Sequence, residues 1–208
     1  MTLPTYANSV FINCPFTADY RPVFRAIVFA VIDCGFTPRC ALEESDGGEV
    51  RLHKIQRIIE QCKFGIHDLS NMDLDPASGL PRFNMPLELG LFMGAKRFGE
   101  GPQKAKRLIV LDQDRYRYQK SISDISGQDV DAHNGDPETA IRRIRDWLKT
   151  VSKRKTIPGA TFVIKRYRAY DLDYPGICSA LKYDQQGLPF NDLLETMVEW
   201  EKLNADSS

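Results

Sequence analysis

The chain has 208 residues, of which 42% are apolar and 27% are charged, so it is long enough to bury one sizeable core. Its 28 basic residues equal its 28 acidic residues, which speaks against a nucleic-acid-binding surface, because such a surface is expected to be basic. No apolar run approaches the roughly 20 residues of a membrane helix, and the first residues lack the pattern of a secretion signal, so we expect a cytoplasmic protein without a membrane partner.

The five cysteines are odd in number and lie mostly in apolar stretches, which favours reduced, buried thiols over a disulfide framework. Their spacing fits no zinc site, and the three histidines lie far from any cysteine pair. We therefore expect neither a metal nor a cofactor.

The first two-thirds of the chain alternates between strand-like and helix-like segments. We expect strands at 9–13, 36–42, 64–69, 107–112 and 129–132, and helices at 20–34, 50–61, 82–96 and 137–151. Gly35 supports the end of the first helix, because glycine commonly follows a helix C-terminus. This order predicts an α/β fold, with a flavodoxin-like parallel sheet of about five strands and helices on both faces.

Residues 1–151 are therefore expected to form the α/β domain, and residues 152–208 a C-terminal extension that opens with a linker. Within the extension we expect a strand at 161–164 and a helix at 188–203. About fifty residues are too few for a comfortable independent core, so we expect the extension to pack on the main domain or on a second subunit of a homo-oligomer.

The helix expected at 82–96 carries an acidic residue on its apolar side. Glu88 stands among apolar residues that include Leu87, Leu89 and Leu91, and an unpaired buried carboxylate costs several kcal/mol. The chain therefore either pairs this carboxylate or uses it. Asn84 lies one turn earlier on the same face, which predicts the wall of a pocket.

Two simpler interpretations of this helix stay open. Glu88 would then form a salt bridge with Arg25, Arg82 or Lys96. Asn84 would then serve only as the N-cap of its helix.

Open parallel sheets bind ligands beyond the carboxyl ends of their strands, and this rule selects the candidate site. It predicts substrate contacts from residues that follow the strands or begin the Glu88 helix, namely Asn13, Pro15, Phe16, Ser70, Arg82, Asn84 and Asp114. A carboxylate at Glu88 and a second acid, Asp68 or Asp114, suit cleavage of an N-ribosyl bond, because the transition state resembles an oxocarbenium ion.

Two further features have competing interpretations. A thiol nucleophile formed by Cys14 with His67 is disfavoured, because His67 alternates with Asp68 and should point to the opposite face of the sheet. The basic and aromatic stretch 115–120 suggests a lid over the pocket in preference to a nucleic-acid contact.

These segments resemble those of nucleoside 2-deoxyribosyltransferases over about residues 8 to 112. The stretch 10–16 resembles their strand followed by Gly-Pro-Phe, with Cys14 in place of the glycine. Asp68-Leu69-Ser70 and Glu88-Leu89-Gly90 resemble their third-strand aspartate and the helix that carries their nucleophile. The resemblance extends to Toll/interleukin-receptor (TIR) domains that cleave NAD. It implies that Glu88 is the nucleophile, Asp68 a substrate-binding or acid residue, and Asn84 a ribose contact.

We therefore expect an N-glycosidase or deoxyribosyltransferase that cleaves the N-ribosyl bond of a nucleoside, nucleotide or NAD, with bacterial defence as one setting for it. The partner is then a small-molecule substrate, and no nucleic acid is expected. The alternative is a non-catalytic TIR-like module that binds a nucleotide signal or a protein partner.

Overall fold

The computed structural model describes residues 4–44, 46–72, 74 and 79–204, and the statements below refer to these. One five-stranded parallel sheet has the order β2-β1-β3-β4-β5. Its strands are β1 (Ser9–Asn13), β2 (Thr37–Arg39), β3 (Phe64–Asp68), β4 (Arg107–Asp112) and β5 (Val130–Ala132). The helices are α1 (Arg21–Asp33), α2 (Arg51–Glu60), α3 (Asn84–Phe98), α4 (Pro137–Ser152), α5 (Ala160–Leu181) and α6 (Phe190–Leu203). The predicted α/β fold class is confirmed.

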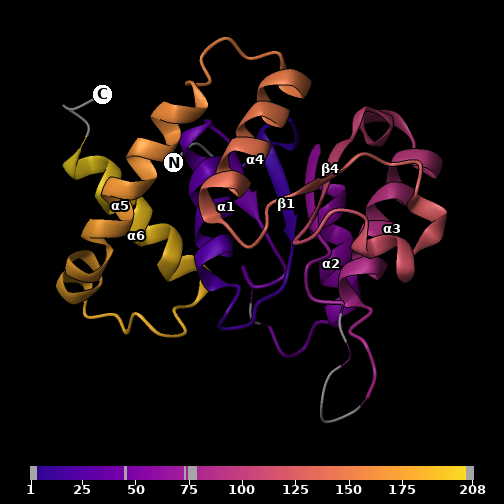
Figure 1. Ribbon diagram of the computed structural model, residues 1–208, viewed down its shortest axis with the longest axis horizontal. Helices are drawn as coiled ribbons and strands as arrows, with labels where there is room; N and C mark the ends of the chain where they lie inside the picture. The colour runs from indigo at the N-terminus through magenta and orange to yellow at the C-terminus, as the bar shows by residue number, and fades with distance from the viewer. Residues whose placement is uncertain (1–3, 45, 73, 75–78, 205–208) are drawn as a thin grey trace.

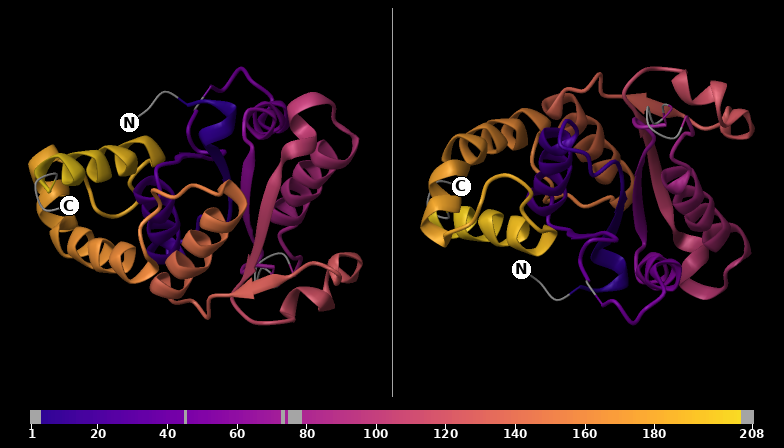
Figure 2. Two further views of the ribbon diagram at one scale, coloured as in Figure 1. Left: turned by 90° about the horizontal axis from the view of Figure 1, so that it is seen from above. Right: turned by 90° about the horizontal axis from the view of Figure 1, so that it is seen from below.

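Helices cover both faces of the sheet, as Figures 1 and 2 show. Helices α1 and α4 pack together on one face, and α2 and α3 pack together on the other. Helices α5 and α6 form an outer layer against α1 and α4. The sheet therefore lies between two helical layers, and a third helical layer covers one of them.

The strands contribute alternate residues to the two faces, as the pleat of a strand requires. Val10 and Ile12 of β1 belong to the core under α1 and α4, while Phe11 packs with α2 and α3 on the other face. In register with them, Val10 pairs with Phe64 and Ile12 with Ile66. All five side chains are buried, which is why the strand sequences are apolar throughout.

Helix α3 buries one stripe of side chains, Met85, Glu88, Leu89 and Phe92, at the spacing expected of one helical face. The sequence places Leu87 among the apolar neighbours of Glu88, but in the structure Leu87 is 53% exposed. Glu88 therefore occupies a position in the buried stripe.

The extension is helical from its first element, so the strand expected at 161–164 is wrong. Val163 and Ile164 have high strand propensity, but Tyr167, Tyr170 and Tyr174 continue the apolar stripe at helical spacing, and the longer pattern prevails. The ring of Phe29 in α1 lies 5.3 Å from that of Tyr170 and 5.7 Å from that of Trp200 in α6. The described part of the extension thus shares the core of the α/β domain.

Within the described part of the chain, no helix has the length and apolarity that crossing a bilayer would demand.

Candidate active site

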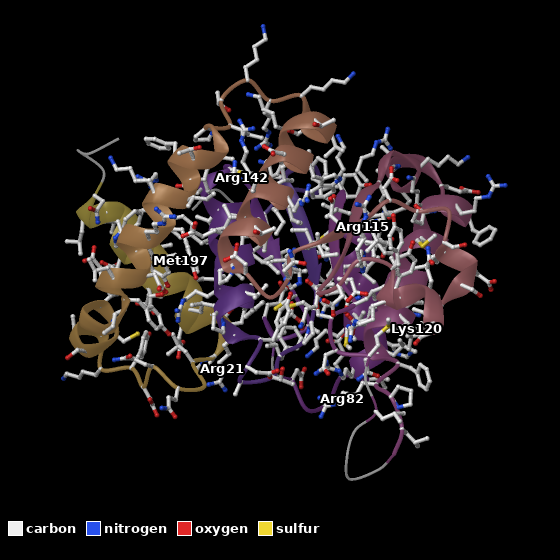
Figure 3. All side chains as sticks on the ribbon, in the orientation of Figure 1. Arg21, Arg82, Arg115, Lys120, Arg142 and Met197 are labelled. Carbon is white, nitrogen blue, oxygen red and sulfur yellow. The ribbon has the colours of Figure 1, made fainter. Side chains whose placement is uncertain are left out.

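A cavity of about 180 Å³ lies beside the carboxyl ends of β1 and β3, at the start of α3. This is the edge at which open parallel sheets bind ligands. Its walls come from the loops after β1 and β3 and from the first turns of α2 and α3, and they are formed by Asn13, Cys14, Pro15, Phe16, Thr17, Arg51, Asn71, Arg82, Asn84, Met85 and Glu88. We call it the Glu88 cavity. Figure 3 labels Arg82 at the lower edge of the molecule.

The Glu88 cavity gathers six of the nine residues predicted for the site. These are Asn13, Pro15, Phe16, Arg82, Asn84 and Glu88. They come from two segments that are far apart in the sequence, the end of β1 with its following loop and the start of α3, and the bond from Asn13 Nδ2 to the carbonyl oxygen of Met85 joins these segments.

Glu88 is a buried acidic side chain in the wall of this cavity. It is only 7% exposed, and it forms no hydrogen bond or ion pair with any other described residue. Burial raises the pKa of Glu88 to about 7, and the positive charge of Arg51 opposes this rise. A carboxyl group that is desolvated, unpaired and exposed to a cavity has the properties of a reactive group.

The salt bridges considered for Glu88 do not form among the described residues. Arg25 pairs with Asp171 of α5, with Nη2 and Oδ1 2.5 Å apart, and it also lies over the ring of Tyr174. The interpretation of Glu88 as half of a structural ion pair therefore has no support in this structure.

Asn84 does not cap its helix. The N-cap position of α3 is Phe83, and no side chain there bonds to a backbone amide. Asn13, at the end of β1, instead fixes this end of the helix, because its Nδ2 donates to the carbonyl oxygen of Met85 at 2.8 Å. The Asn84 side chain lines the cavity one turn before Glu88.

His67 and Asp68 face opposite sides of the sheet, as their alternation predicted. The ring of His67 packs against Phe92 of α3, and its Nδ1 lies 3.1 Å from Nδ2 of Asn13. Burial lowers the pKa of His67 to about 3, with a smaller contribution from the charge of Lys106. A neutral His67 that accepts from Asn13 is not positioned to activate Cys14.

Asp68 is fully buried and lies in a saturated network behind the cavity. Its Oδ1 accepts from the amide and the hydroxyl of Ser70, and its Oδ2 accepts from Tyr20 at 2.5 Å and from His133 Nε2 at 2.9 Å. Burial by itself would raise the pKa of Asp68, but the bonds from His133, Ser70 and Tyr20 lower it below its usual value. Neither Asp68 nor Ser70 lines the cavity, so a direct contact of either with substrate stays a prediction without geometric support.

Ser70, His133 and Asp68 contain the residue types of a hydrolytic triad, but their geometry is different. The amide of Gly135 donates to Nδ1 of His133 at 3.0 Å, so the ring proton belongs on Nε2. Nε2 is also the atom nearest both Ser70 Oγ and Asp68 Oδ2. His133 therefore donates to the carboxylate and cannot accept a proton from Ser70, which a triad requires.

Sequence reasoning missed His133 and several residues of the cavity wall, among them Thr17, Arg51 and Asn71. His133 follows β5 directly, so the rule that selected residues at the ends of the other strands would have selected it as well. Arg51 gave no signal, because its place in the cavity depends on how the start of α2 packs beside the loop after β1.

Asp114 and the expected lid lie elsewhere. Asp114 is exposed and does not line the Glu88 cavity. No residue of the stretch 115–120, whose ends Arg115 and Lys120 are labelled in Figure 3, lines it either. Arg117 instead pairs with Asp112 at the end of β4, at 2.9 Å, and Tyr118 is buried. The sequence placed this stretch over the pocket, and the structure does not.

Among the described residues, no group of three or more histidine, cysteine or acidic side chains is close enough to hold a metal ion. Comparison of the chain with protein-family models, curated proteins and solved structures finds no significant match. The family resemblance therefore depends on the short motifs alone, and the functional argument depends on the site.

Proposed function

We propose that this protein cleaves the N-ribosyl bond of a nucleoside, nucleotide or NAD, with Glu88 as the residue that attacks or stabilises the anomeric carbon. One observation carries the proposal, namely a buried carboxyl group that has no hydrogen-bond or ion-pair partner among the described residues and lies in the wall of a cavity at the carboxyl edge of a parallel sheet. Breaking an N-ribosyl bond develops positive charge on the sugar, and a desolvated carboxylate stabilises such charge more strongly than a solvated one.

The raised pKa of Glu88 fits this role. With a pKa of about 7, the group is partly protonated at neutral pH. A developing oxocarbenium ion in front of the carboxylate favours its ionised form, so the interaction is stronger in the transition state than in the ground state.

The other lining residues suit a phosphorylated sugar. Asn71 and Asn84 supply amide groups that can bond ribose hydroxyl groups. Arg51 and Arg82 supply cations for a phosphate, and Arg82 stands just before the first turn of α3, where backbone amides favour an anion. In this scheme Asp68 acts at a distance, because its network fixes the end of β3 behind the cavity.

The test is release of free base. Wild-type protein is incubated separately with NAD, ATP and deoxynucleosides, and free base is detected by chromatography. We expect release from at least one of these substrates, and we expect Glu88→Gln to lose it while the protein stays folded. Glu100→Gln is the matched control, because Glu100 is exposed and lies just beyond the opposite end of α3.

No release from any substrate would contradict the proposal. Saturable nucleotide binding that survives Glu88→Gln, without base release by the wild type, would instead support the non-catalytic TIR-like module.

A further inference from the structure

A second cavity, of about 530 Å³, adjoins the Glu88 cavity. Its walls come from the loop after β1, from the start of α1, and from the segment that leads into α6. We call it the extension cavity. Pro15, Phe16 and Thr17 line both cavities, so one short loop forms a wall that the two share. The connection between α5 and α6, which contributes the far wall, lies at the lower left of the molecule in Figure 1.

The lining of the extension cavity is mainly apolar and aromatic. The ring of Phe24 lies edge-on to Phe16 at 5.3 Å and within 6.1 Å of Phe190. Phe16 is 37% exposed and Leu42 is 41% exposed, so apolar surface is available to a ligand. Aromatic and aliphatic walls of this kind bind flat heteroaromatic rings, including nucleobases, by stacking and burial.

One cation stands at this cavity without an ion-pair partner among the described residues. Arg21, at the first position of α1, is exposed. Its guanidinium group lies beside Gly187, in the segment that leads into α6. Arg25, one turn further along α1, is held by Asp171 and Tyr174. Arg21 is therefore the arginine suited to a ligand phosphate, and Figure 3 labels it, like Arg82, at the lower edge of the molecule.

The sizes of the two cavities indicate which part of the substrate each can bind. The Glu88 cavity, at about 180 Å³, is smaller than the roughly 300 Å³ at the lower end of sites for drug-sized ligands. It suits a ribosyl group and not a whole nucleotide. The extension cavity exceeds that lower bound, and the shared loop places it next to the sugar.

We propose that the extension cavity binds the distal, non-reacting base of the substrate, with Arg21 contacting a phosphate that links the two halves. This inference rests on the proposed function and deepens it, because it specifies a substrate in which phosphates join the reacting ribosyl group to a second nucleoside. The C-terminal extension is then part of the substrate site. Arg21 and Leu188, an apolar residue of the cavity wall just before α6, are specificity-determining residues.

The test compares two probes in a Glu88→Gln background, in which no turnover is expected. ADP-ribose carries a ribose, a diphosphate and a distal base, whereas ribose 5-phosphate carries only the sugar and one phosphate. By isothermal titration we expect ADP-ribose to bind at least about tenfold more tightly than ribose 5-phosphate. Arg21→Gln and Leu188→Asn should each weaken ADP-ribose binding by about five- to tenfold and leave ribose 5-phosphate binding unchanged.

Arg142→Gln is the matched control, because Arg142 is an exposed arginine on α4 that lines neither cavity. No measurable ADP-ribose binding, equal affinity for both probes, or an unchanged affinity in Arg21→Gln would overturn the inference. If base release persists in these cases, the proposed function stands and only the second subsite fails. If base release is absent but ADP-ribose binding depends on Arg21, the proposed function fails and the two-cavity binding site stands.

Discussion

Replacing Glu88 with glutamine should stabilise the folded protein at alkaline pH. Burial raises the pKa of Glu88 from its ordinary value of 4.5 to about 7, against the opposing effect of Arg51. Between these pH values the folded protein holds a proton that the unfolded chain has already released. The stability of the wild type therefore falls as the pH rises through this interval.

The size of the effect follows from the same two values. The gap between 4.5 and about 7, at about 1.36 kcal/mol per pKa unit, corresponds to about 3 kcal/mol. Glutamine has nearly the same shape and no charge to bury, so the variant lacks this dependence on pH. We expect the free energy of unfolding of Glu88→Gln, relative to wild type, to rise by about 3 kcal/mol between about pH 4.5 and about pH 8.5.

Urea denaturation of both proteins across this pH range measures the difference directly. Glu100→Gln should show no such trend, because Glu100 is exposed. A difference between Glu88→Gln and wild type that does not change with pH would refute the reasoning, since it would mean that folding does not raise the pKa of the Glu88 carboxyl.

Two further substitutions test the surroundings of the site. Tyr20→Phe removes a donor to the buried Asp68 carboxylate and should lower the free energy of unfolding at neutral pH by about 1.5–3 kcal/mol. Tyr116→Phe, at an exposed tyrosine, should change this free energy little. Equal effects of the two substitutions in urea denaturation would contradict the hydrogen bond from Tyr20 to Asp68. Gly65→Ala should destabilise by about 1–3 kcal/mol, because a Cβ there would lie 2.8 Å from atoms of Phe92 and His67, while Gly176→Ala in α5 has open space and should be neutral or stabilising. A Gly65→Ala protein with the wild-type thermal midpoint would show that this packing is looser than described.

The fold was largely predictable from the sequence because the strands and helices of the α/β part each carry a consistent local pattern. The range predicted for β4 is the range observed, and Gly35 ends α1 with the positive φ of +79° that glycine tolerates. The error at 161–164 has a local cause, since a four-residue window there contains strand-forming residues. Only the longer register through Tyr167 and Tyr174 shows the helix.

The site was less predictable, because it depends on which ends of elements meet in space. Glu88 stood out as a charge on an apolar face, and the structure places it in the cavity wall. The sequence did not indicate that Asp68 would be enclosed by Tyr20 and His133, because that enclosure depends on α1 and on the turn after β5. The extension cavity could not be predicted from the sequence either, because its walls come from segments about 170 residues apart.

The pH dependence of base release by wild-type protein, with Glu88→Gln beside it, tests the role of Glu88 most directly. If the ionised carboxylate acts on the anomeric carbon, kcat/KM should rise about tenfold per pH unit on the acid side and level off near the Glu88 pKa of about 7, and the variant should show no release at any pH. A profile that is flat between about pH 5 and 9, or a variant that releases base at the wild-type rate, would contradict the account.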